Sequence, residues 1–215
     1  NYALENDQVG GEATLKVRQG LDAAGLDYTI KLVPWSRAMR YASTQENALI
    51  YTITRTPARE PDFDWLVPLA DSNFYLFVRA DEQRTVSREA LAAGHFTAAC
   101  VTGDLTCDLL ASTGIPAANV TQISDSGTGD FRLVVAGRAD LYISDLAVNN
   151  RFRQAEGYSP TITKPVMRLG GKVGFYLAGG QQVNAALRNR VRAAYDRLLA
   201  DGGFAANADR EENKD

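Results

Sequence analysis

The apolar positions of the chain recur with two different periods, and these predict an alternation of helices and strands. Ala13, Val17, Leu21 and Ala24 recur at helical spacing before Gly25, which predicts a helix over 11–24. A stripe of apolar residues between arginines predicts a last helix over 183–199. Short runs rich in β-forming residues predict strands over 28–33, 48–54, 96–101, 120–124, 139–144 and 162–169, with helices over 34–41, 87–93, 104–112, 127–136 and 145–154.

Two further runs, 73–79 and 172–178, are extended and uninterrupted. Their spacing would let them carry the chain out of one lobe and back into it. Gly170-Gly171 and Gly179-Gly180 flank the second run, and such pairs suit either hinge dihedrals or simple turns. The repeated strand-helix units predict an α/β fold whose sheets are largely parallel and are flanked by helices.

Length and composition are those of an ordinary globular chain with a small partner. The 215 residues fit one large domain or two lobes, and 45% hydrophobic with 23% charged residues allows a real core. The net charge is −3, and Lys and Arg form no basic stripe along the sequence. A nucleic-acid partner is therefore not expected. No leader sequence and no apolar run of about 18 to 20 residues is apparent, which a membrane helix would need.

The few cysteines and the one histidine limit the disulfide and metal sites that the chain can form. Cys100 and Cys107 lie seven positions apart, which suits either a short disulfide loop in an oxidising compartment or two buried thiols. His95 is the one histidine of the chain and is expected in a surface loop. With no Cys-x-x-Cys pair either, neither a zinc site nor any other cofactor is expected.

Two motifs and three landmarks carry a family resemblance. VPWSRA at 33–38 and YTITRTPARE at 51–60 resemble the extracellular solute-binding proteins of family 3, the polar amino-acid-binding type. NFYLFV at 73–78 is similar to the first crossover strand of that family, and GFYLA at 174–178 to the return crossover. ADLYISD at 139–145 is similar to the strand of the second lobe that ends in an acidic residue.

The resemblance implies a type II periplasmic binding protein fold. Lobe one would comprise residues 1–75 and 177–215 and lobe two residues 76–176, each a mostly parallel sheet flanked by helices, with two crossover strands between them. It also implies a secreted monomer of the periplasm, with its signal peptide removed, that delivers an amino acid or a derivative to the membrane permease of an ABC uptake system. One departure is the strand that precedes the residues matching Asn1-Tyr2 in the family, which is not found here.

An amino acid needs a cation for its carboxylate and an anion or carbonyls for its ammonium, because closure removes water from both. The resemblance implies that Arg59 clamps the carboxylate from lobe one and that Asp145 meets the ammonium from lobe two. Taken alone, Arg59 also fits a surface residue paired with Glu60 or Asp62, and Asp145 fits a helix N-cap.

Further contacts follow from the same resemblance. Thr54 and the backbone at Thr52 match positions that offer a hydroxyl and a carbonyl, while Asp104 and Leu105 fall where N–H groups at a helix start face the ligand. Three aromatic residues are candidates to stack on the ligand or line the cleft, although each equally fits a core position: Tyr2, Trp35 and Tyr51.

Two other functions use the same fold. It resembles cyclohexadienyl dehydratases and the binding-like domain of some wall-cleaving enzymes, but Asp145 is short for a proton donor and no Ser-His-Asp or Cys-His set can be assembled. The chain is therefore expected not to be an enzyme. The stronger alternative is the extracellular input domain of a membrane receptor, a kinase or a cyclase.

Overall fold

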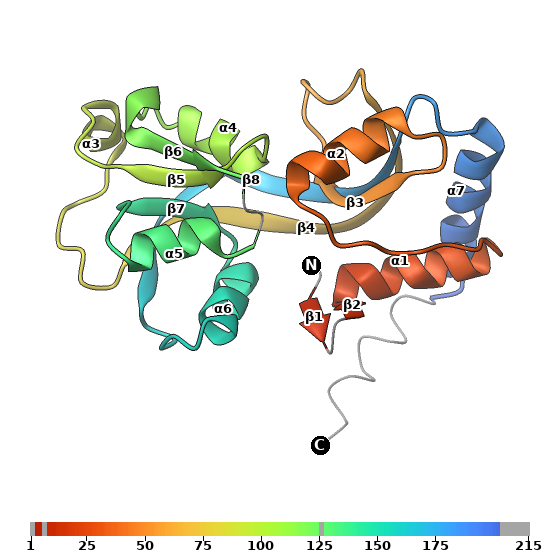
Figure 1. Ribbon diagram of the computed structural model, residues 1–215, viewed down its shortest axis with the longest axis horizontal. Helices are drawn as coiled ribbons and strands as arrows, with labels where there is room; N and C mark the ends of the chain where they lie inside the picture. Colours follow the sequence, from red (N-terminus) through yellow and green to blue (C-terminus); the bar gives the residue numbers. More distant parts are fainter. Residues whose placement is uncertain (1–2, 6–7, 125–126, 203–215) are drawn as a thin grey trace. The chain divides into compact units, whose positions relative to one another are not determined.

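The computed structural model describes residues 3–5, 8–124 and 127–202 (Figure 1). The chain divides into two compact units. The first comprises Asn1–Val33, Arg37–Asp71 and Gly174–Asp215, and the second comprises Pro34–Ser36 and Ser72–Val173. The candidate residue Tyr2 lies outside the described residues.

Six strands are hydrogen-bonded neighbours in the order β3-β8-β4-β7-β5-β6. β5 pairs in parallel with both β6 and β7, whereas β3–β8 and β4–β7 are antiparallel. The expected α/β class is confirmed, and the expected parallel pairing is found in the second unit. In the first unit the pair β3–β8 is antiparallel, because the long strand β8 brings the chain back against the direction of β3. The strands are β3 (Leu49–Thr54), β4 (Phe63–Arg79), β5 (Ala98–Val101), β6 (Val120–Ile123), β7 (Leu141–Ser144) and β8 (Thr163–Gly180).

The first unit carries its own apolar core. Helix α1 (Glu12–Ala23) packs on α7 (Ala185–Ala200), and the predicted stripe Ala13, Val17, Leu21 and Ala24 is buried. Burial of this stripe, rather than the intrinsic preference of twelve residues for a helix, supplies most of the stability of α1. The core joins residues from α1, β4, β8 and α7: Val17, Leu21, Leu66, Val67, Leu69, Leu177, Val191 and Tyr195.

The second unit is a three-layer arrangement. Helices α4 (Leu105–Ala111) and α5 (Gly129–Val135) lie on opposite sides of β5, β6 and β7 (Figure 1). Its core contains Phe131, Phe77 and Tyr142, and the rings of Phe77 and Tyr142 stack with centroids 5.4 Å apart. The remaining helices are α2 (Trp35–Thr44), α3 (Arg88–Ala92), α6 (Leu146–Ala155) and the single 3-10 turn η1 (Ala117–Asn119).

Most predicted elements are found within a few residues of their expected ends, but two expectations are wrong, and the run predicted at 73–79 is the end of a strand, β4, that begins at Phe63. Residues 26–34 form no strand despite their β-forming composition; Tyr28 and Ile30 pack against the core of the first unit instead. A β-former becomes a strand only beside a hydrogen-bonded neighbour. The predicted strands at 162–169 and 172–178 are one strand, so Gly170-Gly171 lies inside β8 rather than at its border. Two short strands were not predicted: β1 (Ala3–Glu5) pairs with β2 (Gln8–Gly10) in a separate antiparallel sheet.

Candidate functional site

In the first unit, four of the predicted residues lie on or just beyond β3. Arg59 follows the strand in a turn and is only 8% exposed. Its Nη1 donates to the carbonyl oxygen of Thr54 at 3.0 Å and to Thr54 Oγ1 at 2.6 Å. These bonds fix the direction of the guanidinium at the end of the strand. The burial of Arg59 does not fit the surface alternative, and Glu60, one of the two partners considered for it, pairs with Arg55.

The strand is irregular where the sequence predicted backbone contacts. The register of β3 against β8 shifts between Tyr51 and Ile53, and Thr52 has a φ of 58° in the left-handed region. Among the described residues it is the one non-glycine with a positive φ. A β-branched residue rarely adopts this conformation, and backbone strain of this kind concentrates at functional sites. No sequence signal indicated it.

Tyr51 is hydrogen-bonded to helix α1. Its hydroxyl lies 3.1 Å from Thr14 Oγ1, and Thr14 Oγ1 in turn donates to the carbonyl oxygen of Gly10. Burial raises the pKa of Tyr51, an effect that the hydrogen bond with Thr14 partly opposes. Thr14 was not predicted to take part; its position beside the buried stripe of α1 was the available signal.

In the second unit, the predicted residues follow the ends of two neighbouring parallel strands. β5 ends at Val101 and leads through Gly103 and Asp104 into α4, while β7 ends at Ser144 and leads through Asp145 into α6. Because β5 and β7 pair in parallel, both connections leave the same edge of the sheet. Ligands of open α/β sheets bind at such an edge, outside the carboxyl ends of the strands.

Both acidic residues cap the helices that they precede. Asp104 accepts a hydrogen bond from the backbone N–H of Thr106 at 2.9 Å, and Asp145 Oδ1 accepts one from Val148 at 2.8 Å. The N-cap interpretation of Asp145 is therefore confirmed. A carboxylate has two oxygens and about four acceptor positions, so capping leaves capacity for a second donor. Leu105 is the first residue of α4 and is buried.

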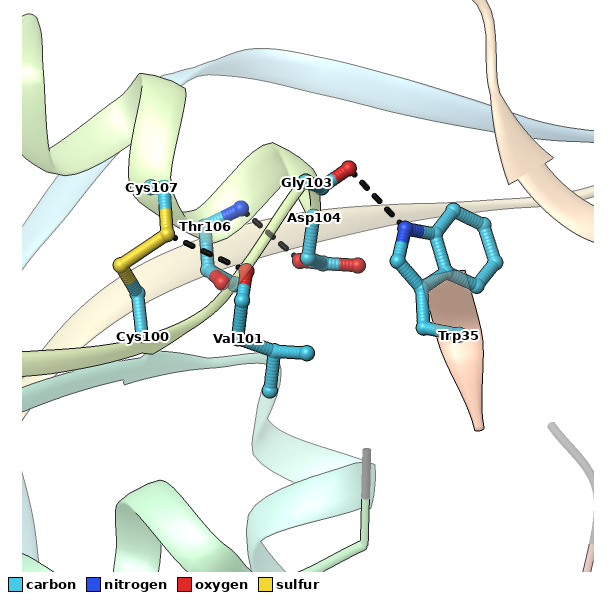
Figure 2. Close-up of a disulfide and its surroundings, with 7 residues drawn as sticks. All are labelled: Trp35, Cys100, Val101, Gly103, Asp104, Thr106 and Cys107. Atoms are coloured by element: carbon cyan, nitrogen blue, oxygen red, sulfur yellow. Dashed lines mark hydrogen bonds between the residues drawn. A yellow bond between two sulfur atoms is a disulfide. The ribbon is translucent and has the colours of Figure 1, made fainter. Parts of the chain in front are cut away.

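The turn between β5 and α4 is held by a disulfide and by an indole (Figure 2). The structure joins Cys100 and Cys107, with their Cα atoms 5.3 Å apart. Trp35 Nε1 donates to the carbonyl oxygen of Gly103 at 2.9 Å. The turn also contains a buried hydroxyl, Thr106 Oγ1, that has no hydrogen-bond partner in the described part of the chain.

The structure thus groups the candidates by unit. Tyr51, Thr52, Thr54 and Arg59 lie together at β3 in the first unit. Trp35, Asp104, Leu105 and Asp145 belong to the second unit, where the first three surround one turn. None of these residues lines either of two cavities in the second unit. The larger of the two has a volume of about 710 Å³ and lies between β6 and α5.

Over 3–5, 8–124 and 127–202, no cluster of three or more His, Cys, Asp and Glu residues is suited to hold a metal ion. No helix within the same residues combines the length and apolar character needed to span a bilayer.

The chain resembles several proteins of known structure. No family model and no curated protein sequence matches the chain. A histidine kinase sensor domain with similarity to periplasmic binding proteins superposes with a TM-score of 0.84 at 18% identity, covering 97% of this chain and 89% of that one. The arginine-, lysine-, histidine-binding protein ArtJ from Geobacillus stearothermophilus gives 0.82 at 15% identity, over 100% and 90%. An ancestral arginine-binding protein bound to arginine gives 0.79 at 16% identity, over 96% and 89%. The chain therefore has the type II periplasmic binding protein fold that its motifs implied.

Proposed function

We propose that this chain is a periplasmic solute-binding protein that closes over a small amphoteric ligand, an amino acid or a derivative, without changing it chemically. The observation that carries the proposal is Arg59, an 8% exposed guanidinium oriented by Thr54 at the end of a strand. A planar guanidinium held in this way suits bidentate binding of a carboxylate.

The second half of the proposed site supplies the opposite charge. Asp145 is 6% exposed and follows β7, next to the turn that contains Asp104. An ammonium group bound there would meet a carboxylate and the carbonyl oxygen of Gly103. Thr52 would add backbone carbonyl contacts, Leu105 backbone N–H contacts, and Tyr2, Trp35 and Tyr51 aromatic surface.

We further propose that the two lobes correspond to residues 1–75 with 177–215 and to residues 76–176. β4 and β8 would then serve as the connectors about which the lobes close, with ligand selecting the closed form. A ligand that contacts both lobes would shift this equilibrium by its differential affinity for the closed form. The chain would act as a monomer and deliver its ligand to an ABC permease.

The choice of first ligands follows from the similar structures, two of which are named for binding arginine. L-Arginine, L-lysine, L-histidine and L-glutamine would be screened by thermal shift, alongside opines, polyamines and simple carboxylates. A ligand that binds only the folded protein must raise the melting temperature. The proposal fails if no amphoteric compound raises the melting temperature, whether or not simple carboxylates or polyamines do so.

A second candidate function is the input domain of a membrane receptor, because a histidine kinase sensor domain is among the similar structures. Both functions use the same site, so binding measurements do not separate them. The coding sequence beyond Asp215 does: a receptor continues into a membrane helix and a signalling domain, whereas a transport protein does not.

A further inference from the structure

The disulfide closes a loop that contains three of the proposed second-unit residues. Cys100 is the penultimate residue of β5 and is fully buried, and Cys107 lies in the first turn of α4. Between them lie Gly103, Asp104 and Leu105. A covalent bond therefore spans the segment that contains these three proposed ligand contacts.

The backbone bonds within the turn that follows Thr102 are short in sequence, whereas Thr102 N–H itself donates to the carbonyl oxygen of Ile123 in β6 at 2.9 Å. Asp104 N–H donates to the carbonyl oxygen of Val101 at 3.0 Å, and Cys107 N–H donates to that of Asp104 at 3.2 Å. Gly103 has a φ of 73° and is exposed, and nothing lies within 4 Å of the position that a Cβ there would take. Glycine has wide backbone freedom, and a single exposed hydrogen bond contributes little net stability because water competes for it. Beyond Thr102, these short-range bonds and the exposed bond from Trp35 alone would leave the turn free to adopt other conformations.

The disulfide also lies against the backbone of the turn. Cys107 Sγ is 3.1 Å from the carbonyl oxygen of Val101, the residue that ends β5 (Figure 2). Because a bonded cysteine carries no thiol proton, this is a packing contact and not a hydrogen bond. The bond thus anchors the start of α4 to the buried end of β5, on the side of the turn away from Gly103.

Trp35 reports on the position of this turn. Its indole Nε1–H points at the carbonyl oxygen of Gly103 and donates to it at 2.9 Å (Figure 2). Pro34–Ser36 is grouped with the second unit. If the turn moved, this hydrogen bond would be lost and the environment of the indole would change.

We propose that the Cys100–Cys107 disulfide is a positioning element of the ligand site: it holds the Gly103 carbonyl, Asp104 and Leu105 in place, and ligand affinity depends on it. Its role in binding rests on the proposed function, whereas its role in fixing the turn does not. Reduction by a dithiol would break the S–S bond, transfer two electrons and two protons to the sulfurs, and close the dithiol to its own disulfide. An oxidising compartment would then keep the site assembled.

The test uses Trp35 as the reporter. Trp65→Phe makes Trp35 the sole tryptophan of the chain, since the sequence has two. In that background Cys100→Ser/Cys107→Ser is expected to shift Trp35 emission to longer wavelength and to speed amide exchange at Thr106 and Cys107 by about tenfold or more. Exchange of the β7 amides, Leu141–Ser144, should not change. Reduction of the folded parent with dithiothreitol should reproduce both effects, and reoxidation should reverse them.

Unchanged emission and unchanged exchange without the disulfide would overturn the proposal, as would equal acceleration in β7, which would indicate general destabilisation. The affinity for L-arginine, measured by calorimetry, should fall by about tenfold, an effect of about 1.4 kcal/mol. Equal affinity in parent and variant would remove the role in binding. If the parent binds neither arginine nor any other compound of the panel, the proposed function fails, while the fluorescence and exchange results still decide the role of the disulfide in the turn.

Discussion

The ring of Tyr195 occupies the space that a side chain at Gly20 would fill. A Cβ built at Gly20 would lie 2.0 Å from Tyr195 Cε2, well inside van der Waals contact. Tyr195 is buried in α7, and its hydroxyl donates to the carbonyl oxygen of Lys16 at 3.0 Å. Glycine at this position thus lets α1 and α7 approach closely.

Gly20→Ala is therefore expected to destabilise the protein, although alanine is the better helix former by about 1 kcal/mol. We expect the free energy of unfolding to fall by about 1–3 kcal/mol, as for other over-packed sites. Urea unfolding of the parent and of Gly20→Ala measures this change in the free energy of unfolding. In a Tyr195→Leu background the same substitution should cost less than half as much, and an equal cost in both backgrounds would show that the two residues do not interact.

Arg59→Ala should weaken binding of an amino-acid ligand by about 2–5 kcal/mol, because the carboxylate of the ligand would be buried without its charge partner. Calorimetry with L-arginine measures the loss. Arg55→Ala is the matched control: Arg55 is an exposed arginine four residues away that pairs with Glu60, so its removal should leave affinity unchanged. Comparable losses in both variants, or none in Arg59→Ala, would exclude the proposed role.

Asp145→Asn separates ligand binding from helix capping. Asparagine caps helices about as well as aspartate, so stability should change little. Binding of L-arginine should weaken, whereas binding of 5-guanidinopentanoate, which has no α-ammonium group, should not. Calorimetry with both compounds provides the comparison, and equal losses for the two would remove Asp145 from the ammonium role.

The left-handed backbone of Thr52 should lower the stability of the protein. Its φ of 58° costs a β-branched residue of order 1 kcal/mol or more, a cost that glycine does not have. Thr52→Gly is thus expected to leave the free energy of unfolding unchanged or to raise it by up to about 1 kcal/mol. Thr52→Val should be less stable than Thr52→Gly, because Val keeps the strain, whereas both variants lose the hydrogen bond from Thr52 Oγ1 to the carbonyl oxygen of Tyr51. Equal stability of the two variants would argue against strain.

Glu82 should contribute stability that disappears in acid. The hydrogen bonds of its carboxylate with Arg84 lower the pKa of Glu82 to about 2. Its folded pKa lies below its unfolded value of about 4.3, so the stabilisation is present above that value and is lost as the pH falls from about 5 to 2. Because solvent screens the pair, we expect at most about 1 kcal/mol.

Urea midpoints at pH 6 and pH 3 test this expectation. The difference between the parent and Glu82→Gln should be present at pH 6 and smaller at pH 3. In an Arg84→Met background the difference should be small at both pH values. A difference that grows on acidification would contradict the assignment.

The order of elements and the class of the fold could be predicted from the amino-acid sequence alone. The stripe of α1, the helices that follow β5, β6 and β7, and the motif that contains Thr54 and Arg59 could be recognised because period and local composition are properties of neighbouring residues. The capping role of Asp145 was predictable for the same reason, since it depends on the strand before it and the helix after it.

Packing between distant segments controls which β-forming segments become strands and which backbone groups are strained or covered. Residues 28–33 have strand composition but no strand, and Gly20 is explained by a ring 175 positions away in α7. The left-handed backbone of Thr52 and the hydrogen bond between Trp35 and Gly103 likewise depend on the packing of distant segments. Pairing, steric exclusion and burial act between residues that are far apart along the chain, and the local pattern of a sequence does not contain those distances.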